Sequence, residues 1–229
     1  MRIGVIILSR MNSSRFPGKA LKTVNNKYVL NYVIERAKLV KSIDNIIIAT
    51  SNRDIDDEIE DIFSNNEIKI FRGDLNNVSL RFLECMNYYN LDAAIRMNGD
   101  SPLHNYQLIN NILNKFQKKQ PDIITNVYPR SYPVGMSVEI ISRKAMQIAC
   151  SKMKEQDDLE HVSRFFYTNS EYFEIKNVSQ LPLDHSKVHL AVDTEYDFER
   201  FKWIINQLGS NYIDADYDTI IDLYRKYEK

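Results

Sequence analysis

Positive charge is concentrated in the segment Leu8–Lys19, LSRMNSSRFPGK, which directly follows a short apolar run. Arg10, Arg15 and Lys19 supply two forked guanidinium groups and an ammonium, which together suit the oxygens of a triphosphate. Small side chains such as that of Ser14 let backbone N–H groups approach an anion closely. The glycine spacings of a P-loop and of a dinucleotide-binding turn are absent. We interpret the segment as a phosphate-binding loop of another kind, with a solvated cationic turn as the alternative.

A candidate metal ligand, Asp100, lies in the motif MNGDSPL, directly after another apolar run. Gly99 permits a sharp turn or the close approach of a ligand. A carboxylate that points from a strand end into a crevice is the hard oxygen donor that Mg²⁺ requires when it bridges phosphates. The alternative is a turn aspartate that hydrogen-bonds to its own backbone, which is common in such a sequence.

A second carboxylate, Asp193, lies in HLAVDTEYDFER, between an apolar segment and a helical one. Asp193 or Thr194 could simply cap the helix that follows, whose first turn is acidic. If Asp193 instead meets Asp100 across the sheet, the two carboxylates could share one metal ion. The sequence therefore predicts two alternatives for Asp193, a helix cap or half of a magnesium–triphosphate site.

The first half of the chain alternates short apolar segments with helical spacing, which predicts a mostly parallel sheet with right-handed crossovers. In such sheets ligands bind beyond the carboxyl ends of the strands, where the segments above are found. The expected strands are Arg2–Leu8, Asn45–Thr50, Glu67–Phe71, Asp92–Met97 and Asp122–Val127. The expected helices are Tyr28–Val40, Asp54–Phe63 (with Asp54 as N-cap), Val78–Tyr89 and Tyr106–Phe116.

The pattern changes after Asn126, where Pro129, Pro133 and Gly135 indicate a loop that leads into a strand of either direction. This middle part is interpreted as a cover over the sheet. Further expected helices are Arg143–Lys152, Leu159–Tyr167, Glu195–Leu208 and Tyr217–Tyr227, and further expected strands are Tyr172–Val178 and Val188–Val192. With 229 residues and no linker, repeat or low-complexity tract, a single domain over residues 1–229 is expected.

Composition excludes several classes of protein. The formal net charge is -1, so the chain has no basic excess that would bind nucleic acid or an anionic membrane. No apolar run approaches the ~20 residues needed to span a bilayer. The N-terminal apolar run is too short for a signal peptide, and no small-residue cleavage site follows it. Cys85 and Cys150 lack metal-binding spacing and are expected to be reduced thiols of a cytoplasmic protein.

The motif SRMNSSRFPGKAL resembles the opening signature of the cytidylyltransferases that make CMP-activated acidic sugars. These include CMP-KDO synthetase, acylneuraminate cytidylyltransferase and the spore-coat polysaccharide cytidylyltransferase-like group. The segments NIIIATSN, FRGDLNNVSLRF, RMNGDSPL, YPVGMSVEI, EHVSRFFY and HLAVDTEYDFE occur here in the order that the last group shows, so the resemblance covers nearly the whole chain.

The resemblance implies a three-layer nucleotide-diphospho-sugar transferase-like fold, CTP as a substrate, Mg²⁺ as the metal and a homodimer. About residues 127–180 would form a small element for acceptor binding and dimerisation. By position, the triphosphate contacts would be Arg10, Ser14, Arg15 and Lys19, and the metal ligands Asp100 and Asp193. Other nucleotide-binding residues would be Ser9, Thr50, Ser51, Arg72, Arg81 and Asn98. The acceptor sugar would contact Asn126, Tyr132, Glu139, Glu160 and His161.

One departure from the family pattern concerns base selection. The family commonly has Gln-Ala before the first arginine of the loop, whereas this chain has Leu8-Ser9. These residues would lie near the base, so the departure bears on selection of cytosine and not on phosphate binding. For His161, the sequence leaves open whether the side chain is a general base or only orients its segment.

Three alternatives are retained. A GT-A glycosyltransferase would share the sheet and use an Asp-x-Asp metal motif, for which Asp214–Asp216 is the match, although its place between terminal helices favours a loop and an N-cap. A sugar-1-phosphate nucleotidylyltransferase using UTP or GTP usually has a glycine-rich opening loop, and this chain contains only 6 glycines. The third alternative is a nucleotide-binding module without catalysis, which the presence of both aspartates and Lys19 disfavours.

Overall fold

The computed structural model describes residues 1–65 and 67–229, and over these it forms one seven-stranded sheet beside a small hairpin. The sheet order is β5 (Ile68–Gly73), β4 (Asn45–Ser51), β1 (Ile3–Leu8), β6 (Ala93–Asn98), β8 (Glu139–Ser142), β7 (Ile123–Thr125) and β9 (Ile175–Asn177). Strands β5, β4, β1 and β6 are parallel, whereas β8 is antiparallel to both of its neighbours. The hairpin pairs β2 (Thr23–Val24) with β3 (Lys27–Tyr28).

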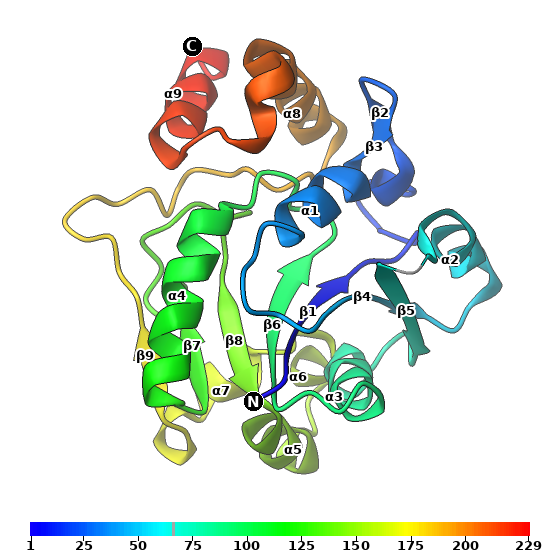
Figure 1. The fold of residues 1–229 in the computed structure, drawn as a ribbon, viewed down its shortest axis with the longest axis vertical. Coiled ribbons are helices and arrows are strands. Elements are labelled where there is room, and N and C mark those ends of the chain that lie inside the picture. Colours follow the sequence, from blue (N-terminus) through cyan, green and yellow to red (C-terminus); the bar gives the residue numbers. More distant parts are fainter. Residues whose placement is uncertain (66) are drawn as a thin grey trace.

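Helices cover both faces of the sheet (Figure 1). One face packs against α1 (Val29–Ala37), α2 (Asp57–Phe63) and α4 (Tyr106–Lys119). The other packs against α3 (Val78–Tyr88), α5 (Arg143–Lys152) and α7 (Arg164–Thr168), with α6 (Gln156–Glu160) beside α3. In β1, Ile3, Val5 and Ile7 join the first core and Ile6 the second, so the strand is apolar on both faces as a covered parallel strand must be. The predicted three-layer α/β architecture is confirmed.

A third core holds the C-terminal helices against the rest of the molecule. Helices α8 (Glu195–Leu208) and α9 (Tyr217–Tyr227) pack with Val29 and Tyr32 of α1 and with Leu103 after β6. Both helices have the bounds that the sequence predicts. The Asp214–Asp216 segment ends in the N-cap of α9, where the Asp216 carboxylate accepts a hydrogen bond from Thr219 N at 2.8 Å. That segment therefore serves as a helix start, as expected.

Three predicted elements differ in the structure. Val188–Val192 is not a strand, because its only β-type contact in the described chain is an isolated bridge between Val134 and His189. The predicted helix Leu159–Tyr167 is two helices, α6 and α7, because His161 takes an extended conformation between them. Asp54–Phe63 begins as a 3₁₀ turn, Asp54–Asp56, and no aspartate side chain caps it.

The other strands and helices lie within a few residues of their predicted bounds, and α4 runs on to Lys119.

Within the described part of the chain, no helix is both long enough and apolar enough to cross a membrane. Cys85 and Cys150 are free thiols. Burial raises the pKa of the Cys150 thiol to about 12, so it stays protonated at neutral pH.

Candidate active site

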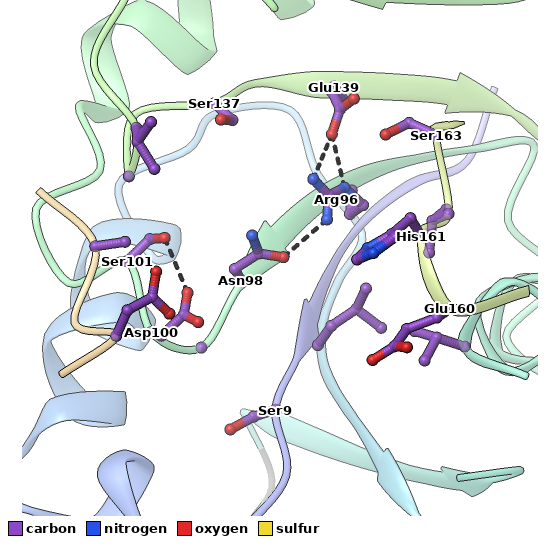
Figure 2. A pocket seen from close by; sticks show the side chains of 18 of the residues that line it. Ser9, Arg96, Asn98, Asp100, Ser101, Ser137, Glu139, Glu160, His161 and Ser163 are labelled. Carbon is purple, nitrogen blue, oxygen red and sulfur yellow. Dashed lines mark hydrogen bonds and ion pairs between the residues drawn. The ribbon is translucent and has the colours of Figure 1, made fainter. Parts of the chain in front are cut away.

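A cavity of about 650 Å³ opens beyond the carboxyl ends of β1 and β6. Figure 2 shows Ser9 on one side of this cavity and Ser137 and Glu139 on the opposite side, with Asp100 and Ser101 near one end. The walls come from the opening segment, the turn after β6, the loop that leads into β8 and the α6–α7 region. The cavity therefore lies where the strand-end rule predicts that a ligand binds.

The opening segment is folded back on itself by local contacts. Gly18 has a left-handed backbone (φ 70°) and its N–H donates to Met11 O at 2.9 Å. The N–H of Met11 in turn donates to the buried carboxylate of Asp56 at 2.7 Å. A residue with a Cβ is disfavoured at such a φ, which explains the glycine before Lys19. The turn brings Lys19 back to the cavity, where the short helix Lys19–Leu21 begins.

Lys19 joins the two predicted metal ligands. Its Nζ lies 2.6 Å from Asp100 Oδ2 and 3.0 Å from Asp193 Oδ1, and its side chain is only 12% exposed. Arg15 approaches Asp193 Oδ1 at 2.9 Å from the solvent side. Two carboxylates that contact the same ammonium must lie close together, although their positions in the sequence are 93 residues apart (193 minus 100). The predicted convergence of Asp100 and Asp193 is present in the fold.

Asp193 is free to face the cavity because its neighbour performs the capping. The Thr194 hydroxyl caps α8 by accepting from Asp197 N at 3.2 Å, and the Asp197 carboxylate accepts in return from Thr194 N at 2.9 Å. Burial would raise the pKa of Asp197, but the bond from Thr194 and the charge of Arg200 hold it below its ordinary value. Thr194, and not Asp193, is therefore the residue that caps the helix. A backbone bond from Val192 N to Asp100 O (2.7 Å) holds the segment that carries Asp193 next to the segment that carries Asp100.

The far wall contains a buried ion pair that links two adjacent strands. Arg96 of β6 and Glu139 of β8 are register partners, and the Arg96 Nε and Nη2 atoms lie 2.7 and 2.6 Å from Glu139 Oε2. The Tyr167 hydroxyl donates to Glu139 Oε1. Burial raises the pKa of Glu139, but the charge of Arg96 and the bonds from Ser163 and Tyr167 outweigh it and leave the pKa below its ordinary value. Glu139 is therefore an ionised acceptor with both oxygens engaged.

The Arg96–Glu139 pair also orients a cavity amide. Arg96 Nη1 donates to Asn98 Oδ1 at 2.8 Å, so the amide nitrogen of Asn98 remains as a donor for a ligand (Figure 2). At the next turn, Ser101 Oγ donates to Asp100 Oδ1 at 3.2 Å. A backbone bond from Ser101 N to Asn98 O, 3.2 Å long, joins these two sets of contacts.

We expect Glu139→Gln to lower the free energy of unfolding by about 3 kcal/mol, because it leaves the Arg96 charge without its partner in the interior. The full difference in unfolding free energy between the wild type and the variant should be seen at neutral pH, where Glu139 is ionised. Because the pKa of Glu139 in the folded protein lies below its ordinary 4.5, the wild type loses this stabilisation as the pH falls below that value. Urea unfolding at pH 7 and pH 4 measures both effects, and an equal difference at the two pH values would contradict the assignment.

Gly99 is placed where the turn after β6 touches the end of β1. A Cβ at this position would lie 2.7 Å from Ser9 Cβ and 3.2 Å from Leu8 O, and the glycine N–H donates to that carbonyl at 2.8 Å. Gly99→Ala should therefore destabilise the protein by about 1–3 kcal/mol through overpacking. Adding Ser9→Gly should recover part of the loss in a chemical denaturation series, whereas additive losses would show that the contact is not the cause.

Most predicted site residues line the cavity. Arg10 contacts Glu160 at 3.2 Å, which joins the opening segment to α6. Arg81 is almost fully buried; its Nη1 donates to Asp74 O at 2.7 Å, and burial lowers its pKa to about 10. The predicted residues that line the cavity are Ser9, Arg10, Ser14, Arg15, Lys19, Arg81, Asn98, Asp100, Glu139, Glu160, His161 and Asp193.

Five predicted residues lie away from the cavity walls. The Ser51 hydroxyl donates to Asp56, and Thr50 is buried beside it in β4. Arg72 is held by Asp57 and Glu60 of α2 and by two backbone carbonyls. The Asn126 amide holds Met136 O and Val138 N of the loop before β8. Tyr132 packs edge-on against Tyr217. The structure does not bring Thr50, Ser51, Arg72, Asn126 or Tyr132 together with the others.

Several cavity residues were not predicted. Arg96 had a signal in the sequence, because a charge in the apolar strand AAIRMN must find a partner when the strand is buried. The other unpredicted polar residues that line the cavity include Ser101, Arg130, Ser137, Ser163, Arg164 and Tyr167. These lie in loops and short helices whose side-chain directions depend on the tertiary fold, so the sequence pattern does not single them out.

Comparison with known proteins identifies the family. The family model described as Cytidylyltransferase matches residues 4–226, almost the entire chain. The chain belongs to the cytidylyltransferase family. It is therefore a CTP-dependent nucleotidyltransferase, and the resemblance found in the sequence is confirmed. The glycosyltransferase and UTP- or GTP-dependent alternatives are not favoured by this match.

Individual relatives support the assignment at moderate identity. A cytidylyltransferase structure from Leptospira borgpetersenii is 29% identical, with a TM-score of 0.93 over 100% of this chain and 95% of that one, which confirms the predicted fold class. The spore coat polysaccharide biosynthesis protein SpsF of Bacillus subtilis is 25% identical over 89% of this chain and 86% of its own length. The 8-amino-3,8-dideoxy-manno-octulosonate cytidylyltransferase of Shewanella frigidimarina is 28% identical over 72% of this chain and 61% of its own length.

Proposed function

We propose that this cytidylyltransferase transfers CMP from CTP to an acidic sugar, a nonulosonic or KDO-like acid, with release of pyrophosphate. The product would serve the synthesis of a surface polysaccharide or glycan. The observation that carries the proposal is the convergence of Asp100, Asp193 and Lys19 at one end of a cavity of about 650 Å³. The name of the Shewanella relative, which describes transfer to a sugar acid, supports the choice of acceptor.

The donor set at this point fits Mg²⁺. Asp100 and Asp193 offer hard carboxylate oxygens close to each other, and the opening segment beside them supplies the cations that a triphosphate needs. When bound between Asp100 and Asp193, Mg²⁺ would neutralise charge on the phosphate oxygens of CTP. Lys19 and Arg15 currently pair with these carboxylates, and they would turn to the triphosphate when the carboxylates are occupied.

The chain's own residues then position the reactants and stabilise the departing charge. The anomeric oxygen of the sugar acid forms a bond to the α-phosphorus, and the bond between that phosphorus and the α–β bridging oxygen breaks. Lys19, Arg10 and Arg15 neutralise the charge that builds on pyrophosphate. The hydroxyl proton leaves to water or to His161, whose side chain lines the same cavity. Positioning within this cavity supplies much of the acceleration.

The acceptor is proposed to lie toward the wall formed by Glu139, Glu160 and His161. Glu139 lies beside Ser163 and Tyr167, and Glu160 beside Arg10. Hydroxyl and carboxylate groups of this kind suit the several hydroxyls of a sugar.

We also propose that the enzyme is a cytoplasmic homodimer, in which about residues 127–180 contribute to the dimer contact. Light scattering at several protein concentrations measures the molar mass in solution and so tests whether the enzyme is a dimer.

Pyrophosphate release with each of the four nucleoside triphosphates, with and without Mg²⁺, tests the proposed reaction. KDO, its 8-amino analogue and an acylneuraminic acid serve as acceptors. We expect pyrophosphate only when CTP, Mg²⁺ and an acid are all present, and a CMP-linked sugar in the mass spectrum. Release with UTP or GTP and a sugar 1-phosphate, or transfer from a finished nucleotide sugar, would instead support one of the alternatives.

A further inference from the structure

Two of the arginines that line the cavity have no carboxylate partner within 4.0 Å among residues 1–65 and 67–229. One is Arg81, which lies near Arg10 on the side of the opening segment. The other is Arg130, in the loop that leads into β8, which contacts Ser137. Figure 2 shows Ser137 on the side of the cavity opposite Ser9. The partnered arginines are Arg10, Arg15, Arg96 and Arg164. The acceptor wall therefore carries one uncompensated positive charge, at Arg130.

The contacts of Arg130 leave one edge of its guanidinium free. Nη1 donates to Pro133 O at 3.2 Å and to Ser137 Oγ at 3.1 Å, and Nη2 donates to the same hydroxyl oxygen at 3.1 Å. Within the described chain, Nε donates to no protein atom, and it is not enclosed by protein. The end of the guanidinium is thus anchored, while the edge formed by Nε and the second Nη2 hydrogen stays available.

The same edge is occupied in the neighbouring arginine. Nε and Nη2 of Arg96 hold a carboxylate oxygen of Glu139 at 2.7 and 2.6 Å. This edge presents two parallel N–H groups, which match the two oxygens of a planar carboxylate better than a hydroxyl or a point charge. Burial lowers the pKa of Arg130 below its ordinary value, so a bound anion would relieve an unfavourable charge.

Ser137 adds a directed donor at the same place. Its oxygen accepts from both terminal nitrogens of Arg130, and its own proton has no protein acceptor in the described structure. The hydroxyl hydrogen is therefore left for a ligand oxygen. Arg130 and Ser137 together offer a charged edge and a neutral donor, a combination that suits a singly charged carboxylate better than a doubly charged phosphate.

We propose that the free Nε edge of Arg130, assisted by the Ser137 hydroxyl, binds the carboxylate of the acceptor and so determines that the enzyme accepts an acid. This inference rests on the proposed function and assigns a residue to its acceptor selectivity. In a 2-keto sugar acid the carboxylate is attached to the anomeric carbon. Holding it therefore also orients the neighbouring anomeric hydroxyl toward the α-phosphorus, and the effect should reach kcat as well as KM.

The test compares an acid with its carboxamide in matched enzymes. The probes are KDO and KDO carboxamide, with CTP and Mg²⁺, for the wild type, Arg130→Met and Arg130→Lys. We expect the wild type to prefer the acid by about 100-fold in kcat/KM, in the range set by a charged hydrogen bond in a closed site. In Arg130→Met, kcat/KM with the acid should fall by about 100-fold, and the preference for the acid over the carboxamide should be less than about threefold. Arg130→Lys should be intermediate, because it keeps the charge without the fork.

The controls separate this inference from the function on which it rests. Arg143→Met removes an arginine outside the cavity, which contacts Asn90 and Asp92, and should keep the wild-type preference. In Arg130→Lys, the KM for CTP and the midpoint of thermal unfolding should change little. If Arg130→Met folds poorly, Arg130→Lys replaces it in the comparison of acid and carboxamide. If Arg130→Met keeps the preference for the acid, the inference is wrong although the function stands. If the wild type uses no acid with CTP, the proposed function fails.

Discussion

Asp100→Asn should reduce the rate of CTP-dependent pyrophosphate release by about a thousandfold, while the protein folds normally. The substitution keeps the shape of the side chain and its contact with Ser101, but removes the charge that faces Lys19 at 2.6 Å. A neutral amide is a poor ligand for Mg²⁺, so the stabilisation of the triphosphate is lost at the point where charge develops. Initial rates at saturating CTP and acid measure the effect.

The Asp214–Asp216 segment supplies the matched control. Asp214→Asn changes an aspartate that lies outside the cavity walls, and Asp216→Asn keeps a residue type that caps α9 equally well. Both variants should retain rates within about twofold of the wild type. A large loss in these two with a normal rate in Asp100→Asn would favour a metal site at the Asp-x-Asp segment, as in the glycosyltransferase alternative. Binding of Mn²⁺ followed by electron paramagnetic resonance gives a second readout for Asp100.

Lys19→Met should produce two effects of comparable importance. Turnover should fall by about a hundredfold or more, since the ammonium no longer stabilises departing pyrophosphate. The ligand-free protein should also be less stable, because Asp100 and Asp193 lose the cation that lies 2.6 and 3.0 Å from them and is mostly shielded from solvent. Arg15 still contacts Asp193 from the solvent side, but it does not reach Asp100, so the two facing carboxylates repel each other more strongly than in the wild type.

A thermal unfolding series with Mg²⁺ makes this prediction sharp. In the wild type, the metal must displace Lys19 from both carboxylates, whereas in Lys19→Met only the exposed Arg15 still contacts Asp193 and Asp100 is left without a cation. We therefore expect Mg²⁺ without nucleotide to raise the unfolding midpoint more in the variant than in the wild type. Lys22→Met is the control, because that side chain lies over Phe16 at 5.4 Å and outside the cavity. Equal responses of the wild type and Lys19→Met would show that Lys19 does not compete with the metal.

The sequence predicts the part of the site that follows from strand order. Lys19, Asp100 and Asp193 each come at or after the end of an apolar segment, and strand ends of a parallel sheet meet at one edge. The rule holds even for Asp193, whose preceding segment is not a strand. A backbone bond from Val192 N to Asp100 O keeps that segment at the same edge of the sheet. Asp193 therefore lies where the sequence predicts it, although Val188–Val192 is not the predicted strand.

The acceptor side is harder to predict, because it depends on an antiparallel strand. The pairing of Arg96 with Glu139 needs the register of β6 against β8, which no local pattern supplies. Asn126 and Tyr132 were expected to face a sugar, but the Asn126 amide satisfies the backbone of the loop before β8. A buried backbone group without a partner is costly, so loops of this kind use side-chain amides internally. Arg130, in the same loop, has no such internal partner for its Nε edge among residues 1–65 and 67–229.

The most direct test follows the α-phosphorus of CTP. The enzyme is incubated with Mg²⁺, a sugar acid and CTP that carries a label on either the α- or the γ-phosphate. We predict that the α-label appears in a CMP-linked sugar and the γ-label in pyrophosphate, in equal amounts, and that both disappear in Asp100→Asn. An α-label that is recovered only as unchanged CTP or as free CMP with every acid, while the protein is folded, would contradict the proposed transfer.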